Sequence, residues 1–204
     1  EHPKDPRFNY PREVDYGSAA ALMVRRTLWE QLGGFDEHFA PAYYEDTDLC
    51  FQIRSLGYRV MYQPRAVVTH FEGVSHGTDT SSGLKAHQTK NQARFADKWR
   101  HVLEHHRANG VEPMLESDRN AAARILWVEA CMLTPDQDSG SLRTIRLLRI
   151  LVSMGCKITY IADNMDGADP YRSQLEGEGV EVIYAPFFKS VGDFLEQLLR
   201  VLLD

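Results

Sequence analysis

The sequence has few cysteines and no long apolar run. The first shortage argues against a disulfide-stabilised protein, and the second argues against a membrane-spanning one. Three cysteines occur in 204 residues, at Cys50, Cys131 and Cys156. Because this number is odd and the spacing is wide, we expect buried free thiols in a reducing compartment, with a disulfide or a catalytic thiol as the alternative. No apolar run reaches the roughly 18 residues of a membrane-spanning helix, and no signal-peptide pattern occurs.

Basic residues are not in excess either. The chain carries 23 Lys and Arg against 29 Asp and Glu, which gives a formal net charge of -6 and a pI near 5.8. A protein that follows the phosphates of a nucleic acid usually presents a basic face, so we expect no nucleic-acid partner. With 43% hydrophobic and 25% charged residues, the composition is that of an ordinary soluble globular protein.

The sequence pattern changes once along the chain. We expect one domain over 1–108, a linker over 109–123 and a second domain over 124–204. The sequence opens at Glu1 without a methionine and stops inside an apolar helical pattern over 194–203. We therefore expect an internal piece of a longer polypeptide.

The first part mixes short strands and helices. Leu49, Ile53 and Leu56 repeat at the spacing of a helix face packed on a core, and Gly57 is placed to end that helix. The elements expected in this part are a buried strand over 14–24, helices over 27–32 and 45–56, short strands over 59–62 and 66–69, a loop over 71–83 and a long helix over 84–107.

The second part alternates strands with helices. Ile145, Leu148, Leu151 and Val152 lie on one face of its first helix, which Gly155 closes. The expected strands cover 125–128, 157–162 and 180–184, and a short helix covers 171–176. This order is typical of the opening of a parallel doubly wound sheet, so the chain is assigned to the α/β class.

Three carboxylates, those of Glu45, Asp46 and Asp48, crowd the first turn of the helix expected over 45–56. Successive residues at a helix start point in different directions, so at most two of them face a common pocket. A carboxylate there could remove a proton from an acceptor hydroxyl as a general base, and the preceding Tyr43-Tyr44 could stack on a sugar ring. Alternatively, the acids only complement the helix dipole.

Two further features allow a functional and a structural interpretation. His70 ends an apolar strand pattern, and it is either a structural histidine or a metal ligand that needs carboxylate partners from elsewhere. Ser139-Gly140-Ser141 precedes a helix that carries Arg143. Backbone N–H groups at such a helix start can bind a phosphate, but the same kind of turn also caps helices that hold no ligand.

Several short motifs follow one another in a fixed order in the first part: Gly33-Gly34-Phe35-Asp36-Glu37, Glu45-Asp46-Thr47-Asp48-Leu49 with Arg54 and Gly57, Tyr62-Gln63-Pro64, His70, and the trailing Asn91, Phe95, Lys98 and Trp99. In this order they resemble family 2 glycosyltransferases of the GT-A fold, over about residues 10–105. The resemblance implies the C-terminal part of a nucleotide-diphospho-sugar transferase domain, which transfers a sugar onto a hydroxyl with inversion.

Carried over to this sequence, the resemblance makes Asp46 the catalytic base. It assigns Glu45, Tyr44 and Asp48 to acceptor binding, and it matches His70 to a histidine that joins a divalent metal, Mn²⁺ or Mg²⁺, in several members. The family's other metal ligands form an Asp-x-Asp motif after an earlier strand, which this chain lacks in that context. We therefore expect the remaining ligands outside this chain and no turnover by this piece alone.

The second part contains Ile125-Leu126-Trp127-Val128, the loop over 134–141, Arg143, Leu147-Leu148 and Gly155. With these residues, 124–204 is similar to the start of a family 4 glycosyltransferase, an incomplete doubly wound, Rossmann-like N-terminal domain of the GT-B fold. In that family a glycine loop approaches the donor diphosphate, which assigns Ser139, Gly140 and Ser141 to phosphate binding. A receiver-like or flavodoxin-like interaction domain is the alternative.

Together the two resemblances imply a fragment of a tandem glycosyltransferase that builds a cell-surface polysaccharide or O-antigen. The expected partners are a nucleotide-sugar donor and a glycan or lipid-linked glycan acceptor. We expect a cytoplasmic protein, either free or peripherally attached to the inner face of the membrane. The alternative function is a catalytically inactive sugar- or nucleotide-binding module that keeps the acceptor-side helix without turnover.

Overall fold

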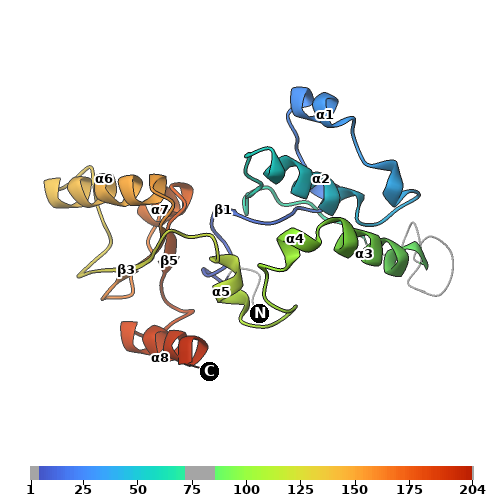
Figure 1. Cartoon of the computed structure of the whole chain (residues 1–204). Helices are drawn as coiled ribbons and strands as arrows, with labels where there is room; N and C mark the ends of the chain where they lie inside the picture. Colours follow the sequence, from blue (N-terminus) through green and yellow to red (C-terminus); the bar gives the residue numbers. More distant parts are fainter. Residues whose placement is uncertain (1–4, 72–85, 204) are drawn as a thin grey trace. The chain divides into compact units, whose positions relative to one another are not determined.

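A computed structural model describes residues 5–71 and 86–203, and the side chains as far as residue 200 (Figure 1). The chain divides into two compact units. The helical unit is Glu13–Ala108, and the sheet unit combines the residues up to Arg12 with those from Asn109 onward. The lead-in residues therefore group with the second patterned part and not with the first. The loop expected over 71–83 lies outside the described residues apart from Phe71.

The helical unit contains four α-helices and two short 3-10 turns among its described residues. Gly33 ends α1 in the left-handed region at φ 78°, a conformation that favours glycine. The helices are α1 (Arg26–Leu32), α2 (Glu45–Ser55), α3 (Ala86–Lys98) and α4 (Arg100–Leu103), with the turns η1 (Ala19–Ala21) and η2 (Glu37–Phe39).

Helix α2 contributes to two separate apolar clusters. Leu49 and Ile53 pack in one cluster, with Leu28 of α1. Phe51 points into a second, aromatic cluster. The members of the aromatic cluster are Phe39, Phe51, Phe95 and Trp99, all under 9% exposed, with Tyr44, Val102 and Leu103 packed against them. Because α2 is anchored on two faces, its first turn is held on a rigid support.

Several sequence-based expectations for this unit are wrong. No strand forms over 14–24, because Ser18 caps the turn η1 and the small residues Ala19–Ala21 stay exposed. The expected strand over 66–69 is also absent, with Val67 84% exposed. A strand needs a hydrogen-bonded neighbour. The pairing described in this unit joins β2 (Met61–Tyr62) to the end of β1 (Arg12–Glu13).

The helix expected over 84–107 is broken in the structure. Trp99 leaves helical geometry at φ -106°, ψ 17° and separates α3 from α4. Leu56, expected on the buried face of α2, is instead its C-cap and is 42% exposed. The cysteines are free as expected, but only Cys50 is buried, whereas Cys131 is exposed and Cys156 half-buried.

The sheet unit is built on three parallel strands in the order β3-β4-β5. Residue Arg124 pairs with Lys157 at the start of β3, and Thr159 pairs with Glu181 further along. Parallel strands need crossover connections, which helices supply here. The elements are β3 (Arg124–Glu129), α6 (Ser139–Ser153), β4 (Lys157–Ala162), α7 (Tyr171–Gly177), β5 (Glu181–Ile183) and α8 (Val191–Leu203).

Helices cover both faces of this sheet (Figure 1). Ile158 and Tyr160 of β4 pack in a cluster with residues of α6 and α7. Ile161, which points to the opposite face of the strand, packs in a second cluster with Phe194 of α8. Both clusters are dominated by residues with almost no exposed surface. This alternation is that of a doubly wound α/β layer, as the sequence predicted.

The stretch expected as a linker over 109–123 contains the helix α5 (Pro113–Ser117). It is attached to the sheet unit, since Ala122 N–H donates to Gly155 O at 3.0 Å. No helix among the described residues has the length and apolar character needed to cross a bilayer.

Candidate active site

The candidate site lies at the start of α2, where the backbone is strained. Tyr43 and Tyr44 adopt positive φ angles of 74° and 73°, in the left-handed region that bulky residues rarely occupy. Such conformations cost free energy and persist only where the surroundings fix them. They turn the chain sharply into the first helical residue, Glu45.

Asn91 of α3 holds this turn in place. Its side chain has no exposed surface. Its Nδ2 lies 2.7 Å from Phe39 O, 2.8 Å from Ala42 O and 3.1 Å from Tyr43 O. An amide NH₂ group carries two donors, which these three carbonyl oxygens share. Asn91 is therefore a positioning residue for the turn before α2.

Asp46 is held by main-chain donors on both oxygens. Ala19 N–H donates to Oδ2 at 2.9 Å, and Thr47 N–H donates to Oδ1 at 2.7 Å. The side chain is half-buried. Thr47 Oγ1 adds a longer donation to Oδ1 at 3.3 Å. These bonds fix the orientation of the carboxylate, and Oδ2 keeps a second lone pair for another donor.

The neighbouring Glu45 has a different environment. Its Oε2 is shielded from solvent and has no hydrogen-bond partner among the described residues. Burial raises the pKa of Glu45 above its ordinary value, an effect that the nearby charge of Asp46 reinforces. Backbone hydrogen bonds from Glu45 and Tyr43 lower this pKa but are outweighed. Asp46 is thus held by hydrogen bonds on both oxygens, whereas Glu45 keeps one shielded oxygen without a partner among the described residues.

Asp48, expected in the acceptor site, lies inside the unit. It is 0% exposed, and its carboxylate accepts from Trp99 Nε1 at 2.7 Å and from Gln52 Nε2 at 2.6 Å. Lys98 Nζ completes the set at 2.8 Å from Oδ1 and 2.9 Å from Oδ2. With no exposed surface, this carboxylate anchors the end of α3 to α2 and has no oxygen left for an acceptor.

Lys98 also reaches Asp36, in the loop after α1. The Nζ–Oδ2 distance is 2.8 Å. Burial by itself lowers the pKa of Lys98, but the hydrogen bonds to Asp36 and Asp48 outweigh it and raise the pKa. The same bond from Lys98, helped by His38 N–H, lowers the pKa of Asp36. Lys98 therefore ties the Gly-Gly-Phe-Asp-Glu loop to α2.

The structure thus shows which partners the residues of the family resemblance contact, which the sequence alone did not reveal. Asn91, Lys98 and Trp99 were recognisable there as a trailing pattern, but their partners were not. Tyr44, assigned to acceptor binding, is half-buried with its ring centroid 5.4 Å from that of Phe95. One side of its ring is therefore used in the aromatic cluster.

His70 does not gather metal ligands in the described part of the chain. The residue is exposed, and it belongs to no group of three described His, Cys, Asp or Glu side chains close enough to share an ion. These residues alone do not fit a metal site around His70. Its role as one ligand of Mn²⁺ or Mg²⁺ remains a prediction, and no chemical step below depends on a metal.

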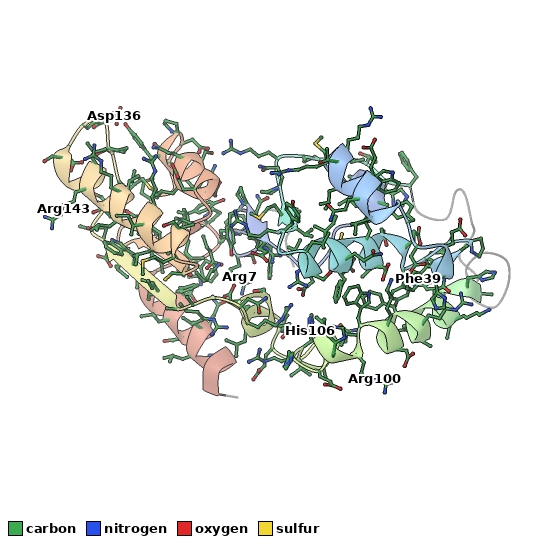
Figure 2. All side chains as sticks on the ribbon, turned by 45° about the horizontal axis from the view of Figure 1, so that its top comes forward. Arg7, Phe39, Arg100, His106, Asp136 and Arg143 are labelled. Carbon is green, nitrogen blue, oxygen red and sulfur yellow. The ribbon has the colours of Figure 1, made fainter. Side chains whose placement is uncertain are left out.

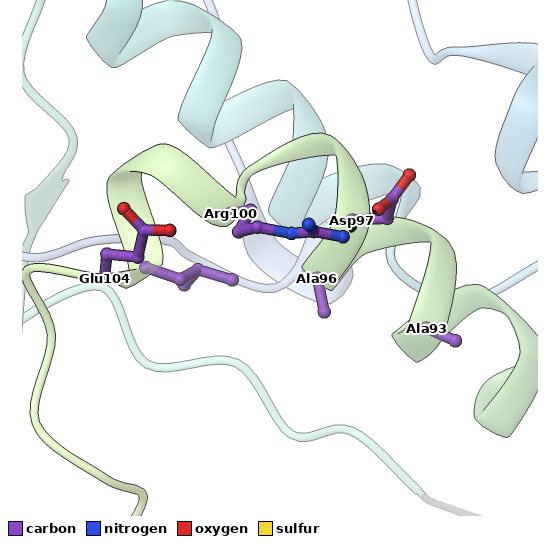
Figure 3. Close-up of a pocket in the computed structure, with 6 residues that line it drawn as sticks. Ala93, Ala96, Asp97, Arg100 and Glu104 are labelled. Carbon is purple, nitrogen blue, oxygen red and sulfur yellow. Dashed lines mark hydrogen bonds and ion pairs between the residues drawn. The ribbon is translucent and has the colours of Figure 1, made fainter.

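A shallow depression on α3 and α4 contains none of the candidate residues (Figure 3). Its rim includes the exposed ion pair of Arg100 with Asp97, 2.5 Å apart. It is lined by Ala93, Ala96, Asp97, Arg100, Leu103 and Glu104.

In the sheet unit, the helix start predicted to bind phosphate is capped by the protein itself. Asp138 accepts from Ser141 N–H at 2.7 Å and from Thr134 Oγ1 at 3.0 Å. Hydrogen bonds from Ser141, through its side chain and backbone, lower the pKa of Asp138. A carboxylate at this position satisfies a free donor of α6, as in an ordinary N-cap. This geometry favours the capping interpretation of Ser139-Gly140-Ser141.

The sequence is similar to named glycosyltransferases. It is 38% identical over 96 residues to the N-acetylglucosaminyl-diphospho-decaprenol L-rhamnosyltransferase of Mycobacterium tuberculosis, which is 45% of this chain and 31% of that protein. It is 39% identical over 57 residues to the pre-mycofactocin glycosyltransferase of the same organism, 28% of this chain and 12% of that protein. The chain thus spans less than a third of either relative.

No family model and no solved structure matches the chain. The named relatives support a relationship to glycosyltransferases of the GT-A type at modest identity. The mixed α/β architecture is consistent with part of such a domain. The GT-B resemblance of the sheet unit is not supported by any of these relatives.

Proposed function

We propose that the helical unit is the acceptor side of an inverting glycosyltransferase that takes its sugar from a nucleotide-diphospho-sugar. The observation that carries the proposal is the start of α2. There Asp46 is fixed by two main-chain donors, beside a desolvated Glu45 and behind the strained Tyr43-Tyr44 turn. Strain and shifted pKa values of this kind concentrate at functional sites.

In the proposed reaction, Asp46 accepts the proton of the acceptor hydroxyl. The freed oxygen forms a bond to the anomeric carbon from the side opposite the leaving group. The bond from that carbon to the diphosphate breaks, and the nucleoside diphosphate leaves with the bond's electron pair. The configuration is therefore inverted, and the proton ends on Asp46.

Glu45 and Tyr44 are proposed to shape the acceptor pocket around Asp46. The uncovered side of the Tyr44 ring can stack on a sugar, whose C–H groups pack well against aromatic faces. Glu45 lies next in the chain, and its half-buried carboxylate is proposed to form the wall of the acceptor pocket beside Asp46. His70 is proposed as one ligand of a divalent metal whose other ligands lie outside this chain.

The relative that is 38% identical supports a lipid-linked glycan acceptor, because it is named as a rhamnosyltransferase that acts on N-acetylglucosaminyl-diphospho-decaprenol. For the sheet unit we keep the proposal of a second, GT-B-type transferase, in a tandem enzyme of cell-surface polysaccharide or O-antigen synthesis. Its support is the parallel β3-β4-β5 layer with alternating helices. Parallel α/β layers occur in proteins of many functions, so the activity of the sheet unit must be established from the residues of its binding site.

The proposal is tested on the complete natural protein with a panel of nucleotide-diphospho-sugars and a polyprenyl-diphosphate-linked glycan. We expect acceptor-dependent release of nucleoside diphosphate and a product whose anomeric configuration, read by NMR, is inverted. Retention of configuration would contradict the mechanism. Binding of a nucleotide-sugar without release, with every donor, would favour the inactive binding module.

A further inference from the structure

The outward face of α6 in the sheet unit is unusually apolar. Leu147, Ile150 and Met154 are 40%, 55% and 64% exposed, and their spacing of three and four residues places them along one side of the helix. Leu142, 36% exposed, adds to the same surface near the helix start. Large apolar side chains gathered on an exposed face mark a contact surface more often than isolated ones do.

The same face is cationic. Arg143, Arg146 and Arg149 are exposed, whereas the 15 residues Ser139–Ser153 contain no Asp or Glu. Arg149 is paired with Glu178 at 2.6 Å. Arg143 and Arg146 make no ion pair with any described residue, and Figure 2 shows Arg143 extending outward from α6. The whole chain has a net charge of -6, so a helix with three arginines and no acidic residue differs in charge from the rest of the protein.

The helix is also firmly seated on the sheet. Its inner residues Ile145 and Leu148 are 2% and 1% exposed, in the main apolar cluster of the unit. The start of the helix is capped by Asp138. The outward face is therefore presented by a rigid element of about 22 Å, since each residue adds about 1.5 Å.

We propose that this outer face of α6, defined by Leu142, Arg143, Arg146, Leu147, Ile150 and Met154, binds the surface of an anionic lipid membrane. Arginines interleaved with Leu, Ile and Met are the composition of helices that lie in the plane of the interface. The apolar side chains enter the boundary between headgroups and acyl chains. The two unpaired arginines approach lipid phosphates, which attract basic residues near the surface.

Charge complementarity favours a lipid surface over a second copy of the chain. Two copies of this face packed across a two-fold axis would bring arginines against arginines, in a contact that contains no acid from α6. A nucleic acid would engage the arginines but leave the exposed Leu147, Ile150 and Met154 without a role. The proposal stands on α6 alone and does not depend on the transferase activity.

The test is sedimentation of the complete natural protein with vesicles of phosphatidylcholine, alone and with about one third phosphatidylglycerol. We expect binding to the anionic vesicles only. Arg143→Glu with Arg146→Glu should lower partitioning by about thirtyfold or more, because each cation removed near the surface weakens binding by about fivefold. Leu147→Ser with Ile150→Ser should also weaken binding, because the apolar area is removed.

The matched control is Arg25→Glu with Arg26→Glu, two exposed arginines of the helical unit, which should leave partitioning unchanged. Thermal unfolding of each variant checks that the fold survives. Equal binding to neutral vesicles, no binding, or equal losses in the control and the α6 variants would overturn the proposal. So would a dimer that only the α6 variants dissociate, since the face would then join two copies. Sugar transfer to a water-soluble acceptor needs no membrane, so this assay tests the proposed function independently of vesicle binding.

Discussion

The main-chain N–H of Ala19 donates a hydrogen bond of 2.9 Å to Oδ2 of Asp46, across 27 residues of sequence. The contact ties the first turn of α2 to the turn η1. It leaves Asp46 oriented by the backbone, while the adjacent Glu45 keeps a shielded oxygen without a partner in the described chain. The two carboxylates should therefore respond differently to substitution and to pH.

Glu45→Gln should raise the free energy of unfolding at pH 7. Burial raises the pKa of Glu45 in the folded state, so folding favours the protonated form and the ionised form is a cost above the ordinary glutamate pKa. Gln removes that charge. As pH falls below the ordinary value, both states bind the proton and the advantage should disappear.

Urea titrations at pH 7 and pH 4 measure this difference. Glu37→Gln, at an exposed position in the turn η2, is the control and should show little change at either pH. A Glu45→Gln variant that is less stable than the parent at pH 7 would show that the carboxylate is satisfied and not desolvated.

Asp48→Asn should destabilise the helical unit by about 2–3 kcal/mol, because hydrogen bonds to a buried charge are strong and Lys98 would lose a partner. Asp97→Asn is the control on the neighbouring helix. Asp97 forms an ion pair with Arg100 in which both side chains are at least 70% exposed. Such solvent-exposed pairs contribute little to the free energy of unfolding. Equal losses of stability in chemical denaturation would refute the anchoring role of Asp48.

Asn91→Asp should cost about 2–4 kcal/mol, because it replaces the donor beside three carbonyl oxygens with an acceptor. Gln92→Glu makes the same amide-to-carboxylate change at the next residue, which is exposed, and should be nearly neutral. Chemical denaturation compares the two. If Asn91→Asp were as stable as Gln92→Glu, the turn before α2 would not depend on this clamp.

His70→Ala in the complete natural protein should raise the Mn²⁺ or Mg²⁺ concentration needed for half-maximal transfer by about tenfold or more, as loss of one metal ligand does. Calorimetric titration with Mn²⁺ gives an independent readout of binding. His101→Ala, on the exposed side of α4, is the control. Unchanged metal titrations for His70→Ala would remove His70 from the site.

Local signals in the sequence predicted the elements that depend on local physics. The strand β4 and the helices α1 and α7 fall close to their expected ranges, and α6 follows its apolar spacing. Gly33 after α1 and Gly155 after α6 adopt the positive φ angles that helix ends favour. The strands expected over 14–24 and 66–69 failed because strand formation depends on a distant partner, which a local apolar pattern does not reveal.

At the candidate site, too, the sequence revealed local features but not contacts between distant residues. A cluster of acids at the start of α2 was visible in the sequence, and so was the trailing Asn91, Lys98 and Trp99 pattern. Which acid is buried was not visible, because Asp48 is enclosed by residues 50 and 51 positions later in the chain. Long-range contacts of this kind separate the structural Asp48 from the half-buried Asp46 and Glu45.

The most direct measurement of the central proposal is sugar transfer by Asp46→Asn in the complete natural protein, with nucleotide-sugar binding measured on the same sample. Asn keeps the size and one acceptor oxygen but cannot accept the hydroxyl proton. Transfer should fall by about 10²- to 10⁴-fold while the Kd for the nucleotide-sugar changes little. Transfer that persists at the parental rate with unchanged binding would contradict Asp46 as the base.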